Sequence, residues 1–263
     1  MGGIVPARSG LRKITPVTGA REAAIERQII AELAGSGVLR AAINMGNPLL
    51  VTGISAAGDP QGVAPDMAAE VARGLQVPVV YVKFDRPSSL ADAAGSDVWD
   101  IGLIGAEPAR AAKIAFTAAY CEIAATYLVP AGSPLRSVAD VDRAGARIAV
   151  RAGSAYDLWL TRHIKHATLV RSDTANGPFE QFVRDGLDAL AGLRPQLMSD
   201  AEKLGGAKIL PGSFTAVQQA IGTPKRNVAG AAFLRDFVEA AKRSGFVASL
   251  IDKHRVTGLA VAA

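Results

Sequence analysis

Apolar residues recur along this chain in two spacings, short unbroken runs and positions three or four residues apart. The runs predict buried strands, and the wider spacing predicts amphipathic helices. In the first half the two kinds alternate, which is typical of a parallel sheet with crossover helices. The predicted strands of this half are 38–43, 77–84 and 101–104, and the predicted helices are 21–33, 65–75 and 88–94.

The same alternation starts again after a turn rich in proline and glycine. A strand at 123–129 runs into Pro130-Ala131-Gly132-Ser133-Pro134, and Pro211-Gly212-Ser213 is a similar turn, so both are candidate hinges. Between them the pattern predicts a helical turn at 138–141, strands at 147–151, 167–170, 187–191 and 208–210, and helices at 154–164, 179–185 and 195–204. The chain returns with an apolar stretch at 214–221 and ends with helices at 228–242 and 246–251. Two similar α/β halves joined by two crossings imply a cleft that closes by hinge motion.

Composition excludes several classes of function. The 263 residues are 49% hydrophobic and 20% charged, as in an ordinary globular protein. The net charge of +5 is spread along the chain without a dense basic run, so nucleic-acid binding is not supported. The single cysteine, Cys121, lies in an apolar run and is expected to be a buried, inert thiol. Neither metal-ligand spacing nor a catalytic triad signature occurs, and no cofactor is expected.

The first candidate site follows the strand at 101–104. Glu107-Pro108 reads as a helix start, which places Arg110 in the first turn at the carboxyl edge of the sheet, where open α/β sheets bind ligands. The planar guanidinium of Arg110 matches both oxygens of a carboxylate, and Gly105 and Glu107 beside it are further candidates. The alternative is a solvated arginine on a short surface helix.

The second candidate site opens the helix at 154–164. Gly153, Ser154 and Ala155 follow a strand, so free backbone amides and the Ser154 hydroxyl form an anion site. Ser154 with Asp157 is also a capping-box pattern, which by itself makes only a good helix start. After the first strand, Asn44 and Asn47 either hydrogen-bond a ligand or only form the turn.

The segments 62–68 and 100–120 and the strand–Gly153-Ser154–helix segment resemble the family 3 solute-binding proteins, the amino-acid-binding components of ABC importers. The resemblance covers about residues 36–255. It implies a two-lobe type II periplasmic-binding fold: 1–35 an N-terminal arm and helix, 36–129 plus 213–263 lobe 1, and 130–212 lobe 2. It also implies that Arg110 and the groups near Ser154 grip a ligand carboxylate, that an ABC permease is the partner, and that the protein is a periplasmic monomer.

The chain departs from the family pattern at three places. The aromatic clamp after the first strand is replaced by Asn47-Pro48-Leu49-Leu50, and the turn before Arg110 is shortened. The aspartate that binds an α-amino group is missing, and Arg194 stands near its place. Because an arginine repels an ammonium and attracts an anion, we expect a dicarboxylate or another organic acid rather than a simple α-amino acid. Alternatively, Arg194 is a surface residue that caps the helix ahead of Pro195.

Two other classes of function stay open at this point. The fold also hosts a cyclohexadienyl dehydratase, but His163 and His166 lie at a helix end, where a cation is expected for structural reasons. A cytoplasmic ligand sensor is the other alternative, with the helix at 21–33 either contacting a partner or packing on lobe 1. Residues 1–20 read as a loose arm without the apolar core of a signal peptide, so either an export signal was removed or the protein stays inside the cell. We therefore expect a binding protein without enzymatic activity.

Overall fold

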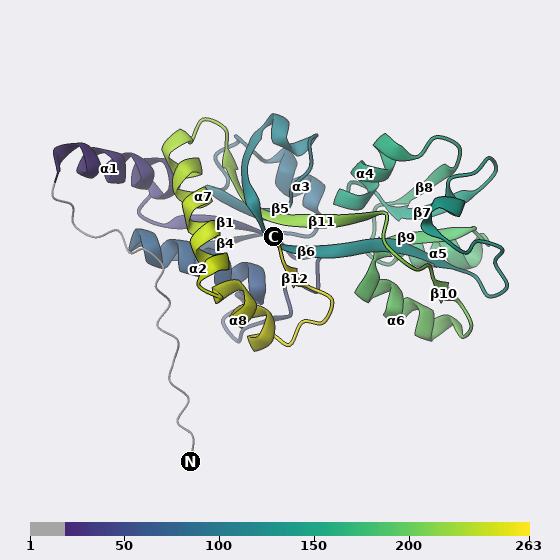
Figure 1. The fold of residues 1–263 in the computed structure, drawn as a ribbon. Coiled ribbons are helices and arrows are strands. Elements are labelled where there is room, and N and C mark those ends of the chain that lie inside the picture. Colours follow the sequence, from purple (N-terminus) through teal and green to yellow (C-terminus); the bar gives the residue numbers. More distant parts are fainter. Residues whose placement is uncertain (1–18) are drawn as a thin grey trace, which may run out of the picture.

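A computed structural model describes residues 19–263 as two α/β lobes built on one continuous sheet (Figure 1). The sheet runs in the order β4-β1-β5-β11-β6-β9-β7-β8. Its strands in chain order are β1 (Leu39–Asn44), β4 (Val79–Phe84), β5 (Ile101–Gly105), β6 (Ile114–Val129), β7 (Arg147–Arg151), β8 (Thr168–Ser172), β9 (Ala189–Leu193) and β11 (Thr215–Pro224). The predicted two-lobe α/β fold is confirmed.

Within each lobe the outer strands are parallel, as the strand–helix alternation predicts. β1 pairs in parallel with β4 and β5 in lobe 1, and β7 pairs in parallel with β8 and β9 in lobe 2. The helices that flank them are α2 (Val63–Leu75), α3 (Pro87–Asp92), α7 (Val228–Arg243) and α8 (Phe246–Lys253) in lobe 1, and α4 (Ala155–His163), α5 (Gly177–Arg184) and α6 (Arg194–Leu204) in lobe 2. Each therefore lies within a few residues of its expected range.

The two lobes are joined by the antiparallel strands β6 and β11, which cross the middle of the molecule (Figure 1). The first part of β6 pairs with β11, and its last residues, Ala125 to Leu128, pair with β9 of lobe 2. The short strand β10 (Lys208–Ile209) pairs with the end of β6. We propose the same lobe boundaries as the sequence indicates, at 129/130 and 212/213, next to these crossings.

Each lobe has its own apolar core. In lobe 1, Leu39, Met67, Ile101 and Leu234 pack together between the sheet and its helices. In lobe 2, a second group holds Tyr127, Ile148 and Leu160, and a third holds Phe182, Leu190 and Leu197. Side-chain burial of this kind is what fixes helices and strands whose own propensity is modest. Aromatic residues are few, so aliphatic side chains supply most of both cores.

The segment between β5 and β6 differs from the expected helix and strand. Glu107-Pro108 begins only one 3₁₀ turn, Arg110–Ala112, in place of a helix, and β6 starts at Ile114 rather than at residue 123. Pairing of Ile114–Ala124 with β11 extends this strand, because long-range sheet pairing overrides local helix signals. Three strands of two residues each, β2 (Gly53–Ile54), β3 (Pro60–Gln61) and β12 (Ala260–Val261), were not predicted because they are too short to show a period.

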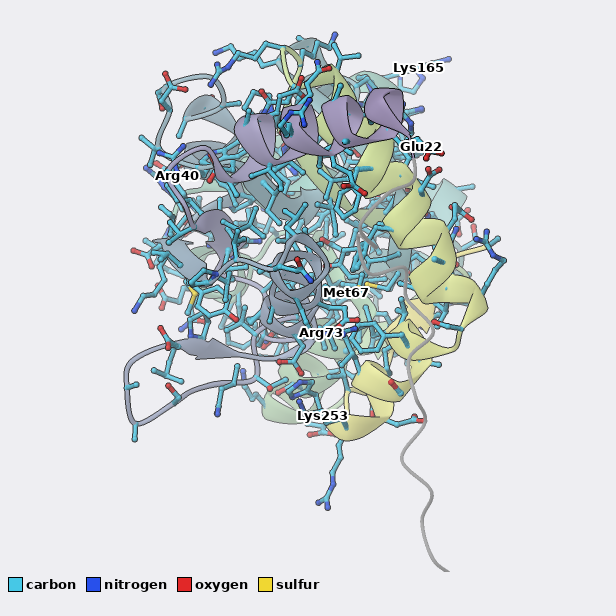
Figure 2. All side chains as sticks on the ribbon, turned by 90° about the vertical axis from the view of Figure 1, so that its left-hand side faces the viewer. Glu22, Arg40, Met67, Arg73, Lys165 and Lys253 are labelled. Carbon is cyan, nitrogen blue, oxygen red and sulfur yellow. The ribbon has the colours of Figure 1, made fainter. Side chains whose placement is uncertain are left out.

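The helix α1 (Ala20–Ala34) packs on lobe 1 beside α7 (Figure 2). The carboxylate of Glu32 accepts a hydrogen bond of 2.7 Å from the backbone N–H of Gly230, and Asn227 donates to the Glu32 carbonyl. A Cβ at Gly230 would lie 2.6 Å from Leu33, so glycine permits this close approach. The predictions of a loose arm and of a missing signal peptide concern residues 1–20, of which 1–18 lie outside the described residues. No helix in the described range is both long and apolar enough to span a membrane.

Candidate functional site

A cavity of about 580 Å³ lies between the two lobes, beside the crossing strands. It is lined from lobe 1 by the ends of β1 and β5 and from lobe 2 by α4, α5, β9 and α6. Six of the residues predicted for ligand binding line it: Asn44, Asn47, Gly105, Arg110, Ser154 and Ala155. The structure thus brings the two candidate sites of the sequence to one cavity.

The guanidinium of Arg110 is held between the lobes at this cavity. The residue is only 6% exposed, and its Nη1 donates to the Gly105 carbonyl at 2.6 Å. Nη2 donates at 2.9 Å to the carbonyl of Gly153 in lobe 2. Among the described residues it forms no ion pair with a carboxylate. Burial lowers the pKa of Arg110 to about 10, so it stays charged at neutral pH while lacking a direct counter-ion.

The N-terminus of α4 faces the same cavity and supplies further donors. Ser154 caps the helix, its Oγ accepting a 3.1 Å hydrogen bond from the N–H of Asp157. Asp157 Oδ2 accepts from the N–H of Gly153 at 2.9 Å, so the predicted Gly153 amide is already used. The N–H groups of Ala155 and Tyr156 make no hydrogen bond within the described part of the chain. Free N–H groups in a first helical turn attract anions through their partial positive charge.

Asn44 and Asn47 line the cavity and also shape the turn after β1. Their Oδ1 atoms accept hydrogen bonds of 3.2 Å from the N–H groups of Gly46 and Leu49, respectively. The two interpretations that the sequence left open are therefore compatible, because each side-chain NH₂ group remains available to a ligand.

Three predicted site residues do not line the cavity. Glu107 forms a 2.6 Å ion pair with Arg162 of α4, across the gap between the lobes. Gly153 contributes only its carbonyl, to Arg110. Arg194, the basis for expecting a second anion, donates to the carbonyl of Gly212 at the second crossing. Contact of these three residues with a ligand stays a prediction.

Arg151 and Gln219 are polar residues of the cavity lining that the sequence analysis did not predict. Arg151, the last residue of β7, donates to the carbonyls of Gly46 at 2.9 Å and Asp85 at 3.0 Å in lobe 1. The sequence shows Arg151 at the carboxyl end of a predicted strand, and an arginine at such an end is the signal that indicated Arg110. Gln219 of β11 is 3% exposed, and its Oε1 has no hydrogen-bond partner. Only its polar character within an apolar run marks it in the sequence.

The rest of the lining is mostly apolar and includes two carboxylates. Leu49, Leu193 and Val217 line the cavity, and Val217 packs with Ala155 at the crossing. Two carboxylates, Glu180 of α5 and Asp200 of α6, also belong to the lining. Asp200 forms a 2.8 Å ion pair with Lys203 and accepts from Gln196, so its charge is compensated.

Reactive side chains are few around the cavity. Cys121 is fully buried in lobe 1, where burial raises the pKa of its thiol, as expected for an inert cysteine. Within residues 19–263 no three His, Cys, Asp or Glu side chains gather in an arrangement that holds a metal ion. Around Arg110 the cavity thus offers one buried cation, two free helix amides and a largely apolar lining.

The sequence of residues 39–257 matches the bacterial extracellular solute-binding proteins, family 3. No curated protein matches the chain significantly. Among solved structures, a mutant of ArgBP from T. maritima superposes with a TM-score of 0.70 at 21% identity, over 86% of this chain and 99% of that one.

Two further structures have the same fold. A putative ABC transporter binding component from Wolinella succinogenes, complexed with lysine, gives a TM-score of 0.69 at 19% identity, over 82% of this chain and 95% of its own. The ancestral amino-acid-binding protein AncCDT-1, a precursor of cyclohexadienyl dehydratase, gives 0.70 at 18% identity, over 85% and 97%. At these identities the likeness establishes the fold alone, and the family match establishes membership.

Proposed function

Since this chain belongs to the bacterial extracellular solute-binding proteins of family 3, we propose that it captures a small carboxylate between its lobes for an ABC-type importer. It acts without chemistry, as a monomer, in the periplasm. The observation that carries the ligand class is Arg110, a buried guanidinium that contacts Gly153 of lobe 2 and has no carboxylate partner among residues 19–263. A ligand carboxylate supplies the missing counter-ion, which a buried charge needs to be stable.

The surroundings of Arg110 support the same ligand. The free N–H groups of Ala155 and Tyr156 and the Ser154 hydroxyl lie at the same cavity, so donors from both lobes converge on one anion. Binding an anion there stabilises the closed arrangement, because a ligand that contacts both lobes shifts the population toward their closed form. Asn44 and Asn47 are proposed to orient the rest of the ligand.

The ligands of structural neighbours agree with a carboxylate-bearing solute. ArgBP from T. maritima is known in an arginine-bound form, and the Wolinella succinogenes protein is complexed with lysine. Both ligands carry a carboxylate. The neighbour that is a precursor of cyclohexadienyl dehydratase keeps an enzymatic alternative in view, but catalysis needs an acid–base group in the cavity. Of the two carboxylates in the lining, Asp200 is paired with Lys203, which disfavours that role, and Glu180 is exposed.

Calorimetric titration of the full chain with a panel of small mono- and dicarboxylates tests the proposal. We expect at least one carboxylate to bind. We expect Arg110→Met, which keeps an unbranched apolar stem without the charge, to weaken carboxylate binding about 100-fold. The matched control is Arg184→Met, because Arg184 is an exposed arginine that forms an ion pair with neighbouring Asp185. Absence of binding by every carboxylate, or unchanged affinity in Arg110→Met, would contradict the proposal.

A further inference from the structure

Gln219 lies directly beside the proposed carboxylate site. In the pairing of β5 with β11, Gln219 stands opposite Gly105, and opposed residues of antiparallel strands point to the same face. A Cβ placed on Gly105 would lie 3.0 Å from both Ala155 and Val217 and 3.6 Å from the Arg110 guanidinium. The Gln219 side chain therefore lies on the face that carries Arg110.

The strand is irregular at this position. The register between β11 and β6 shifts between Gln219 and Ala220 and again before Gly222. Such bulges redirect a side chain and occur often beside binding sites. The neighbouring Gln218 points to the opposite face, where its amide donates to Glu122 at 2.8 Å. Two adjacent glutamines thus differ: one has a protein partner, and the other faces the cavity.

The Gln219 amide lacks a donor for its oxygen. Oε1 is fully buried and accepts no hydrogen bond, which costs about 1–3 kcal/mol for a buried polar group. The neighbouring hydrogen-bond donors, the Arg110 guanidinium and the α4 amides, are assigned to the ligand carboxylate and are not available to Gln219 Oε1. The terminal amide torsion is broad, so the oxygen can turn to the cavity. Gln219 Oε1 therefore lacks a hydrogen-bond donor that a ligand group next to the carboxylate can supply.

We propose that the ligand is a 2-hydroxy carboxylate with an apolar side chain, whose hydroxyl group donates to Gln219 Oε1 while Arg110 holds its carboxylate. This inference rests on the proposed function. A ligand hydroxyl donates the hydrogen bond that Gln219 Oε1 lacks, and it adds no charge beside Arg110. An α-ammonium would add a positive charge beside Arg110. The carboxylates next to the site do not balance it, because Asp157 of α4 is held by Arg171 and Glu107 after β5 by Arg162. Of the two carboxylates in the lining, Asp200 is held by Lys203 and Glu180 is exposed.

The apolar residues of the cavity lining indicate that the side chain of the ligand is apolar. Val217 stands two residues before Gln219 on the same strand face, and Leu49 and Leu193 line the same cavity. A cavity of about 580 Å³ accommodates a side chain as large as an aromatic ring beside the carboxylate. Apolar side chains therefore gain by leaving water, whereas charged ones find few partners close to Arg110.

The test uses three matched series that differ only at the second carbon. They are propanoate, lactate and alanine; 4-methylpentanoate, 2-hydroxy-4-methylpentanoate and leucine; and 3-phenylpropanoate, 3-phenyllactate and phenylalanine. In calorimetry we expect the hydroxy acid of at least one series to bind about tenfold more tightly than both its partners, the effect of one hydrogen bond. A preference for the amino acid, or equal binding of hydroxy and unsubstituted acids, would overturn the inference.

Two variants separate this inference from the proposed function. Gln219→Met keeps length and volume, and we expect it to abolish the hydroxyl preference, so that the hydroxy acid and the unsubstituted acid of a series bind this variant with equal affinity. Gln218→Met is the matched control and should keep the preference. Melting temperatures of both variants verify that they fold, and the comparison of ligands on the wild-type protein needs neither variant. Failure of all three series to bind, while another carboxylate of the panel binds, would overturn this inference alone, whereas absence of binding by every carboxylate would contradict the proposed function.

Discussion

The carboxylate of Glu107 in lobe 1 and the guanidinium of Arg162 in lobe 2 lie 2.6 Å apart, across the gap between the lobes. Together with the Arg110–Gly153 and Arg151–Gly46 hydrogen bonds, this ion pair links the two lobes. Neither Glu107 nor Arg162 belongs to the lining of the cavity, so we propose that their ion pair adds to the free energy of closure.

We therefore expect the Glu107–Arg162 pair to tune affinity through the rate of dissociation. Glu107→Gln and Arg162→Met should each weaken ligand binding about 2- to 5-fold, the range of a partly exposed ion pair of up to 1 kcal/mol. Surface plasmon resonance would show the change in the dissociation rate, and high salt should reduce it. In a double-mutant cycle the two effects should not add. Additive effects would show that the pair does not act as a unit.

Gly105 is expected to set how closely the lobes approach. An added Cβ would lie 3.0 Å from both the Ala155 Cβ and the Val217 Cγ1, which is closer than packed carbon atoms tolerate. Gly105→Ala should therefore weaken ligand affinity about tenfold, by calorimetry, because overpacking costs on the order of 1–3 kcal/mol. Gly53→Ala is the control, since Gly53 is also a strand glycine and its nearest neighbour would be 3.4 Å away. Equal affinities of the two variants would contradict this role.

Ligand affinity should depend on the charge of Arg110 at high pH. Burial places the pKa of Arg110 at about 10, and a bound carboxylate raises it again, since only the protonated guanidinium attracts the anion. Affinity should thus be constant from pH 7 to 9 and should fall as the pH rises through about 10. Calorimetry at increasing pH measures this, with circular dichroism at each pH to verify the fold. A decline centred below pH 8 would assign the dependence to another group.

Asp157 is expected to contribute more to stability than an exposed acid. It is buried, accepts the N–H of Gly153 and pairs with Arg171 at 2.9 Å. Asp157→Ala should lower the free energy of unfolding by about 2–3 kcal/mol, because it leaves the N–H of Gly153 without its acceptor and Arg171 without its carboxylate partner. Asp185→Ala, which removes an acid from an exposed pair, should cost less than about 1 kcal/mol. Urea titrations compare the two variants.

The sequence predicts this fold well where local patterns coincide with tertiary packing. Most strands and helices were placed within a few residues, because their apolar faces are the ones that each lobe buries. The start of β6 was missed because Ile114–Ala119 becomes a strand only through pairing with β11. Likewise, the 3₁₀ turn at Arg110 depends on the chain entering that strand at Ile114.

The sequence predicts those residues of the candidate site that follow a strand or begin a helix. Arg110 and Ser154 follow strands, and the position of a strand end in an α/β sheet is visible in sequence. Gln219 is not visible in this way, because its environment depends on standing opposite Gly105, a register that only the fold determines. The partners of Glu107 and Arg194 come from distant segments, so their side-chain directions could not be predicted.

The sixteen-residue strand β6 has a consequence for the autonomy of the two halves. Since β6 hydrogen-bonds with β11 in its first part and with β9 at its end, no flexible linker separates the cores. Cutting out either half would strip a ladder of backbone groups from the other and leave an open sheet edge, a template for aggregation. The halves are therefore not exchangeable modules, and recombining them with halves of related proteins requires swapping both crossing segments as a matched pair.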